Sequence, residues 1–277
     1  MKRIATRDAV AQVDALVQQP QTLYKGAIIN KRGRTPGKEV PYSEVLAKRL
    51  LHTHNLPEAL THLPKLSNGV DFRPTDHDGT TLNPTILGMN QEAHVATALY
   101  NHHLLGKLGK VIDYSVPIAP DGKHVGTIDL VSFNPDTATL FVIGYSYHEE
   151  RRDTLLYCAL EIATLRNSIR DDHFIRAYAD MLVGLDGNLI HPRDVHIESA
   201  MVFLEGSYQD RSVRALKRMP HVADLILELG IRVFVIGIEL ELRDRPRFTR
   251  KHTKYPYKPV FQFLPVLRER SITTSFV

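Results

Sequence analysis

The stretch Gly126-Thr-Ile-Asp-Leu-Val-Ser-Phe-Asn-Pro-Asp-Thr-Ala-Thr-Leu-Phe-Val-Ile-Gly-Tyr-Ser-Tyr147 decides the fold of this 277-residue chain. Two apolar, β-branched runs flank the segment Asn134-Pro135-Asp136-Thr137. That segment is typical of a turn, because proline presets φ and the Asn and Asp side chains bond the nearby backbone. Two such runs around a short polar break predict an antiparallel hairpin.

The register of this hairpin decides what faces Asp129. If Phe133 faces Leu140 across the turn, then Asp129 faces Gly144. A carboxylate in the middle of an apolar strand is costly unless something pairs with it. We therefore expect a metal, a cation or a hydrogen-bond donor beside Asp129.

The composition is that of an ordinary globular protein, with 43% hydrophobic and 24% charged residues. The formal net charge of +4 mildly favours a polyanionic partner. The single cysteine, Cys158, excludes an internal disulfide and fits a reducing compartment. The first residues lack the apolar segment of a signal peptide, and no run reaches membrane-spanning length. We therefore expect a cytoplasmic protein with no membrane partner.

Hydrophobic periodicity and turn residues predict alternating helices and strands. We interpret residues 1–80 as a mainly helical N-terminal extension, 81–242 as the core, and 243–277 as a basic C-terminal tail packed on the core. In the extension we expect helices over 7–18 and from residue 41, a short strand over 23–30 and an irregular stretch over 55–81. In the core we expect helices over 90–105, 154–165, 174–185 and 210–229, the last broken near residue 220, and strands over 111–118, 195–204 and 231–242 beside the hairpin over 124–147.

The hairpin and this order of elements resemble the core of the PD-(D/E)XK nuclease superfamily. In that family an Asp ends one strand of a hairpin and a Glu-x-Lys lies on the next strand. The segment Gly126-Thr-Ile-Asp129-Leu-Val131, the turn and the strand Leu140-Phe-Val-Ile143 look like this pattern. The resemblance implies an α/β fold, in which helices flank a mixed sheet with a restriction-endonuclease-like α-β-β-β-α-β core.

The chain departs from the family where Glu-x-Lys belongs, because those positions hold Gly144, Tyr145 and Ser146. In the family the strand Asp and this Glu hold the metal, and the Lys positions the attacking water. The resemblance therefore implies that Asp129 is the catalytic metal ligand, whereas glycine offers no ligand and a serine hydroxyl cannot replace an ammonium. An active enzyme would use Mg²⁺ or Mn²⁺, and an inactive one would need no cofactor.

Two further acids are candidate catalytic residues. Glu92 lies near the start of the first predicted core helix, where the family often has an assisting glutamate. Glu161 in the next helix, with Arg151 or Arg152, would replace the missing groups, as some members of the superfamily relocate them. The alternatives are structural: Asp129 bonds within the hairpin, Glu92 is an exposed first-turn glutamate, and the charges before the later helix are a solvated entry.

The tail is dense in cations over residues 243–258, with aromatic side chains between them. Cations that neutralise phosphates and rings that stack on bases suit single-stranded or flexible nucleic acid. The cations that we expect to contact nucleic acid are Arg243, Arg245, Arg247, Arg250, Lys251, Lys254 and Lys258. A solvated basic hairpin is the alternative. A second basic loop, over residues 31–38, is a candidate for lining the same groove.

Together these features predict a nucleic-acid-binding protein whose nuclease core is degenerate and inactive. The first alternative is an active metal-dependent DNA or RNA nuclease, a phosphodiester hydrolase with relocated catalytic residues. The second alternative is a protein-interaction module without a nucleic-acid role. A homo-oligomer or a larger nucleic-acid-processing complex is compatible with each of them.

Overall fold

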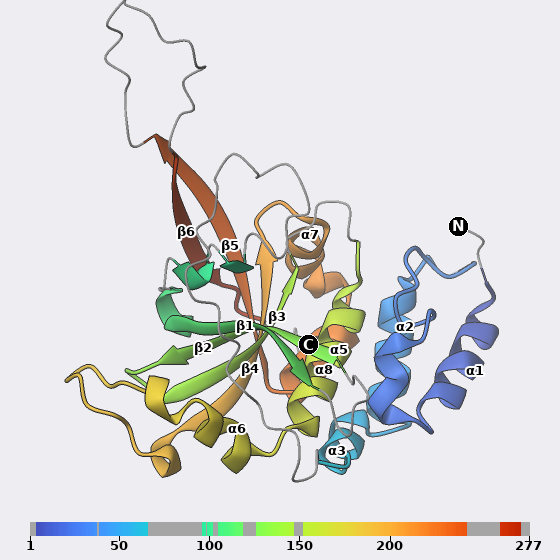
Figure 1. Cartoon of the computed structure of the whole chain (residues 1–277). Helices are drawn as coiled ribbons and strands as arrows, with labels where there is room; N and C mark the ends of the chain where they lie inside the picture. The colour runs from blue at the N-terminus through green and yellow to red at the C-terminus, as the bar shows by residue number, and fades with distance from the viewer. Residues whose placement is uncertain are drawn as a thin grey trace, which may run out of the picture.

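The computed structural model describes residues 4–37, 39–65, 96–97, 99–101, 105–118, 126–146, 152–242 and 261–272, with the backbone alone for 238–242 and 261–265. Figure 1 shows a twisted sheet with helices packed beside it and a group of N-terminal helices at one side. The fold is α/β, with a mixed sheet and flanking helices, as predicted from the sequence, and the restriction-endonuclease-like core stays a prediction.

The sheet in the described part of the chain has six strands, which lie side by side in chain order. They are β1 (Lys110–Ile118), β2 (Gly126–Asn134), β3 (Thr139–Ser146), β4 (His196–Leu204), β5 (Ile231–Leu242) and β6 (Phe261–Glu269). β4 is parallel to both of its neighbours, β3 and β5, and the other pairs are antiparallel. Parallel neighbours need crossover connections, and helices α5 (Leu155–Ser168) and α8 (Pro220–Glu228) lie in these two connections.

The hairpin of β2 and β3 has the predicted register, with Phe133 paired to Leu140. Its turn is held by Asn134, whose Oδ1 accepts a hydrogen bond from the Asp136 N–H at 2.9 Å. The Nδ2 of the same side chain donates to the Lys107 carbonyl at 2.9 Å. The prediction of a hairpin closed by Asn-Pro-Asp-Thr is therefore confirmed.

Both faces of the sheet are buried in its centre. On one face, a large apolar cluster joins β2, β3 and β4 to α5 and α8; its members include Val131, Leu140, Val142, Leu156, Leu160, Ile162, Val222 and Ile226. On the other face, a smaller cluster includes Leu108, Phe141, Ile143, Val202 and Phe234. A strand that is buried on both faces reads as a continuous apolar run, which is the pattern of β3.

Helix α5 is the central helix of the molecule. Thr154 caps it, because its Oγ1 accepts from the Tyr157 N–H at 3.2 Å and donates to the Ile29 carbonyl at 3.1 Å. Buried side chains occur around most of the helix, as expected for a helix covered on several sides. α5 contacts the sheet on one side and the N-terminal helices on the other.

The N-terminal segment consists of α1 (Thr6–Leu16), the 3-10 helix η1 (Pro20–Lys25), α2 (Tyr42–His52) and α3 (Leu56–Thr61). Its buried side chains belong to the same apolar cluster as α5 and α8. The buried Glu44 of α2 accepts hydrogen bonds from the backbone N–H groups of His221 and Val222, at 3.1 and 3.2 Å. A glutamate from α2 thus caps α8, which ties the extension to the core.

Strands β5 and β6 form an arm beyond the rest of the sheet. β5 pairs with β4 only as far as Ile236, whereas its pairing with β6 continues to Leu242. Figure 1 shows this two-stranded arm reaching past the other strands. Residues 261–269 of the predicted tail are therefore an edge strand, and the basic segment 243–258 is the connection between the two strands of the arm.

Two predictions in the N-terminal segment are wrong. Residues 23–30 form no strand, because Pro20 starts a 3-10 helix and local hydrogen bonds such as Ile29 N–H to the Gly26 carbonyl continue the turns. The stretch predicted to be irregular contains α3, which has proline in its first turn, a favourable position for that residue. Residues 66–81 of that stretch lie outside the described residues.

The helix predicted over 174–185 is also wrong in its extent. α6 runs over Asp171–Ala177, with two acids in its first turn, and a 3-10 helix over Ala179–Met181 follows. The helix ends where Tyr178 turns inward and donates its hydroxyl to Asp113 at 2.8 Å. Of the helix predicted over 90–105, the structure describes 96–97, 99–101 and 105.

The remaining predicted elements are confirmed to within a few residues. These are α1, α2, β1, β4, α5, β5 and the broken helical stretch that becomes α7 (Tyr208–Arg214), the 3-10 helix η7 (Leu216–Arg218) and α8. Pro220 marks the break by starting α8. Within the described ranges, none of the helices combines the length and the apolar character that a membrane crossing requires.

Candidate functional site

Asp129 lies on β2 directly beyond the last paired residues of the hairpin. Its Oδ2 accepts a hydrogen bond from the Tyr145 N–H at 2.7 Å. Of the partners expected for Asp129, which were a metal, a cation or a hydrogen-bond donor, the structure shows a hydrogen-bond donor. The Asp129 carboxylate of β2 thus takes the place of a backbone carbonyl as the acceptor for the Tyr145 N–H of β3.

Gly144 faces helix α5 rather than an open site. A Cβ atom built on Gly144 would lie 3.5 Å from the Cβ of Ile162 and 3.8 Å from its Cδ1. A methyl group therefore has room at this position, but a longer side chain would displace Ile162. The space that a second carboxylate would need on β3 is occupied by an apolar side chain of α5.

Ser146 ends β3 and is buried, with 6% of its surface exposed. Its Oγ has no hydrogen-bond partner among the residues that the structure describes. A buried hydroxyl without a partner costs about 1–3 kcal/mol. The end of β3 therefore holds a small neutral group that the described side chains leave unsatisfied.

Glu161 precedes Ile162 on α5 and has partners of its own. Its Oε1 accepts from the Tyr157 hydroxyl at 3.1 Å. Burial, followed by the negative charge of Glu161, raises the pKa of Tyr24 to about 12. These contacts place Glu161 with the tyrosines between α5 and η1.

Most of the other predicted site residues lie outside the part of the chain that the structure describes. Glu92, Arg151 and all seven cations predicted in the tail lie outside the described residues, while Arg152 is exposed just before α5. Within the described ranges, no group of three or more His, Cys, Asp or Glu side chains is arranged to hold a metal ion. The predicted metal role of Asp129 stays a prediction.

A small pocket, here called the basic pocket, lies where the loop before α2 meets the start of α5 and α7. Its volume is about 200 Å³. The residues that line it are Lys31, Arg32, Gly33, Arg34, Pro41, Ser43, Thr154, Leu155, Tyr208, Ser212 and Met219. Three cations and no acid are among these lining residues, so the pocket is electropositive.

The loop that supplies the cations is held in place from both sides. The Thr35 N–H and Oγ1 both donate to the Val40 carbonyl, and the Tyr42 N–H donates to the Gly33 carbonyl. At the other side, Asn30 donates to Asp153 Oδ1 at 2.5 Å. Its own Oδ1 accepts from the Thr154 N–H at 2.8 Å. The basic loop is thus fastened to the start of α5.

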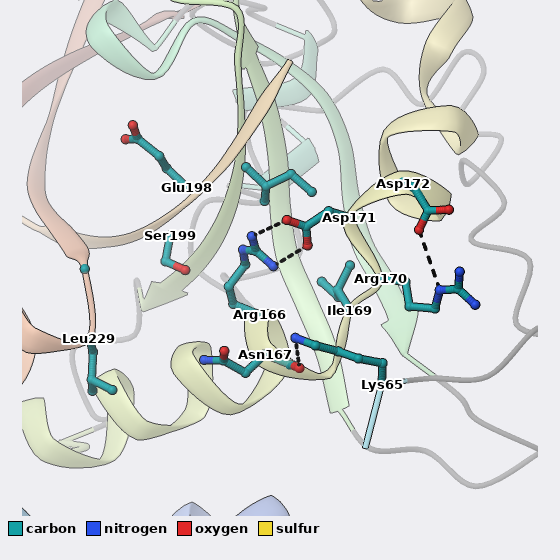
Figure 2. Close-up of a pocket in the computed structure, with 12 residues that line it drawn as sticks. Lys65, Arg166, Asn167, Ile169, Arg170, Asp171, Asp172, Glu198, Ser199 and Leu229 are labelled. Carbon is teal, nitrogen blue, oxygen red and sulfur yellow. Dashed lines mark hydrogen bonds and ion pairs between the residues drawn. The ribbon is translucent and has the colours of Figure 1, made fainter. Parts of the chain in front are cut away.

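A larger pocket of about 630 Å³, here called the paired pocket, lies at the C-terminal end of α5. Its lining residues are Lys65, Arg166, Asn167, Ile169, Arg170, Asp171, Asp172, Ile197, Glu198, Ser199, Leu229 and Gly230. Figure 2 shows Arg166 and Asp171 facing each other between Glu198 and the separate pair of Arg170 and Asp172. Cations and acids therefore alternate around this pocket.

The charges of the paired pocket are satisfied within the protein. Arg166 donates to both oxygens of Asp171, at 2.7 and 2.9 Å. Lys65 Nζ donates to the Asn167 carbonyl at 2.6 Å, at the end of α5. Burial, followed by the charge of Arg166, lowers the pKa of Lys65. These contacts stabilise the end of a helix and leave little charge for a ligand.

The sequence pointed to only part of these sites. The basic loop was visible as a run of cations, but Tyr208 and Ser212 are far from it in the chain, and nothing in their local pattern indicated a pocket. The paired pocket carried no sequence signal. Comparisons of the chain with protein-family models, with curated proteins and with solved structures give no match.

Proposed function

We propose that this protein binds nucleic acid through a PD-(D/E)XK-like core that does not hydrolyse it. The observation that carries the proposal is the position of Gly144. Leu130 pairs with Ile143, so the continued register puts Gly144 opposite Asp129, and Ile162 covers the space of the missing carboxylate. The order β1, β2, β3, α5, β4 follows the order of strands and helix in the core that the sequence resembles.

The absence of hydrolysis rests on the chemistry of the metal centre. Mg²⁺ and Mn²⁺ take hard oxygen ligands, and hydrolysis also needs a group that polarises the attacking water. Asp129 supplies one carboxylate, which the Tyr145 N–H already engages. Gly144 supplies no ligand, and Ser146 supplies no positive charge. Asp129 alone is a poor metal site.

The nucleic-acid partner, DNA or RNA, is supported by the distribution of cations. The chain has a net charge of +4, and seven arginines and lysines occur in the segment that connects the two strands of the arm. The basic pocket adds cations from a different part of the chain. Such cations bind phosphates with an affinity that falls as salt rises.

The experiment that tests the proposal is a panel of supercoiled plasmid, linear duplex, single-stranded DNA and RNA. Each is incubated with the protein and with Mg²⁺ or Mn²⁺, and binding is measured by mobility shift over a series of salt concentrations. We expect no cleavage and a shift that weakens as salt rises. Asp129→Ala is expected to bind as the wild type does, because the affinity comes from the cationic surface.

Other outcomes would replace the proposal with one of the alternatives. Cleavage that Asp129→Ala abolishes would establish an active nuclease, and Glu161, Arg151 and Arg152 would be tested next as its relocated groups. A folded Asp129→Ala variant that loses binding would contradict the role given to the cations. A protein that neither cleaves nor binds any substrate of the panel would be a protein-interaction module.

A further inference from the structure

The basic pocket combines charge, shape and order in one place. Lys31, Arg32 and Arg34 line it, and no acidic residue is among its lining residues. Arg32 and Arg34 are exposed, and neither forms an ion pair with any residue in the described ranges. Their charges are therefore available to a ligand.

The position of Arg32 and Arg34 is electrostatically unfavourable, because they line a pocket at the start of α5. Thr154 and Leu155 line the same pocket, and they are the cap and the first residue of α5. The N-terminal end of a helix carries partial positive charge, so cations next to it repel both the helix and one another. Asp153, the acid nearest in sequence, bonds to Asn30 and is not among the lining residues.

The loop holds these cations in a fixed arrangement. Backbone hydrogen bonds across residues 33–42, together with the two bonds of Asn30, anchor it at both ends. A solvated run of cations on an ordinary surface loop would need no such attachment. Fixed cations, by contrast, bind an anion with a smaller loss of conformational entropy.

We propose that the basic pocket binds a phosphate group, and that on a nucleic-acid strand it holds one backbone phosphate beside a base that contacts Tyr208. This inference rests on the proposed function for its macromolecular ligand. A volume of about 200 Å³ accommodates a phosphate, and it is smaller than the pockets of about 300–1,000 Å³ that enclose whole small molecules.

The side chains around the cations suit this ligand. Guanidinium groups match the geometry of phosphate oxygens and bind them through paired hydrogen bonds. Tyr208 is half-buried, and its hydroxyl forms no hydrogen bond with a described residue, so it has a donor to offer. Its ring offers a stacking surface, which every base can use.

The test uses the full chain with two ligands, inorganic pyrophosphate and a single-stranded oligonucleotide. The variant Arg32→Gln with Arg34→Gln removes two charges from the pocket. Its matched control, Arg7→Gln with Arg193→Gln, removes two charges from exposed arginines that do not line the pocket. All four arginines are exposed, so both variants are expected to fold, which circular dichroism and thermal unfolding verify.

We expect the pocket variant to bind pyrophosphate at least about tenfold more weakly, since it lacks two charged hydrogen-bond donors, and the control to stay within about twofold. For the oligonucleotide, the slope of log affinity against log salt should fall by about 0.7 for each phosphate that the variant no longer neutralises. Equal reductions of affinity in the two variants, for both ligands, would overturn the proposal, because they would show a general charge effect.

The two ligands separate failure of the pocket from failure of the proposed function. Oligonucleotide binding that survives unchanged in the pocket variant, with no binding of pyrophosphate by the wild type, would overturn the pocket and leave the proposed function standing. Pyrophosphate binding that only the pocket variant loses, without any nucleic-acid binding, would support the phosphate site. In that case the proposed function would fall and the source of the ligand would be a free phosphate compound.

Discussion

The two ends of helix α5 each carry a pocket, and the pockets differ in how their charges are used. At the C-terminal end, Arg166 donates two hydrogen bonds to Asp171, and Lys65 donates to a carbonyl in the last turn of the helix. At the N-terminal end, Arg32 and Arg34 line the pocket with no acid among its lining residues. The charges of the larger pocket are paired within the protein, whereas Arg32 and Arg34 form no ion pair with a described residue.

The difference shows that volume is a poor guide to a binding site. Cations at a helix C-terminus stabilise the helix by about 0.3–1 kcal/mol each, so the residues of the paired pocket have a structural reason to be there. Cations at the N-terminus have the opposite effect. Arg32 and Arg34 therefore lie where helix electrostatics disfavours cations, which supports the proposed phosphate site.

The largest expected effect is at Gly144, which packs against Ile162 of α5. Gly144→Glu must displace Ile162 and bury a charge, so we expect the free energy of unfolding to fall by about 3 kcal/mol. Gly144→Ala is the control, and it should stay within about 1 kcal/mol because its Cβ has ordinary contacts. Denaturant unfolding measures both. A Gly144→Glu variant of wild-type stability that binds Mg²⁺ would show that the metal site still has room.

The attachment of the basic loop gives the next largest effect. Asn30→Ala removes the hydrogen bonds to Asp153 and Thr154, one of them to a carboxylate, so we expect a loss of about 1–2 kcal/mol in unfolding free energy. Affinity for pyrophosphate should weaken severalfold, because the cations are no longer held in place. Asn188→Ala, in an exposed turn, is the control and should change neither quantity. If Asn30→Ala binds pyrophosphate as tightly as the wild type does, anchoring of the basic loop is not needed for binding.

The ion pair of Asp14 and Arg49 lies outside both pockets, and its contribution to stability should depend on pH. The hydrogen bond from Arg49, opposed by burial and helped by His54, lowers the pKa of Asp14 from 3.8 to about 2. A lowered pKa stabilises the folded state fully above the unfolded pKa near 4, and this stabilisation is lost as pH falls toward 2. Since the pair is partly exposed to solvent, Asp14→Asn should cost only about 1 kcal/mol at pH 7. Urea unfolding at pH 7 and at pH 2 checks this, and a cost that persists at pH 2 would contradict it.

The smallest expected effect is a gain of binding in the paired pocket. Asp171→Asn removes the charged partner of Arg166 while leaving the shape of the side chain. We expect a stability loss of about 0.5 kcal/mol, because Asp171 is half exposed. Weak pyrophosphate binding should appear at this end of α5, detected by chemical-shift changes near Arg166. If the variant binds no pyrophosphate at all, the pairing of charges is not what distinguishes the two pockets.

The parts of the fold that the sequence predicts well are those with local causes. The hairpin follows from Asn134, whose side chain bonds a residue two positions away, and α5 follows from the cap at Thr154. The length of α6 follows from the bond between Tyr178 and Asp113, which are 65 positions apart, and no local pattern reports such a contact. The strand predicted at 23–30 was wrong for the related reason that an apolar run fits a buried turn as well as a strand.

The candidate site likewise has features that local sequence predicts and features that depend on tertiary packing. That Asp129 would face Gly144 could be predicted, because the hairpin register is set by its turn. That Ile162 would cover Gly144 could not, because the packing of α5 depends on the N-terminal helices as much as on the sheet. The basic loop was visible in the sequence, but its pocket exists only because α5 and α7 meet it in space.

The cap that Glu44 provides for α8 has a consequence for how the chain acquires its fold. The donors at His221 lie 177 positions later in the sequence, so most of the chain must be made before this contact can form. The N-terminal helices therefore expose an apolar face until the later part of the chain has been synthesised. Contacts of such long range also slow folding. We expect the N-terminal segment to depend on chaperones during translation, and a fragment that ends before α8 to aggregate.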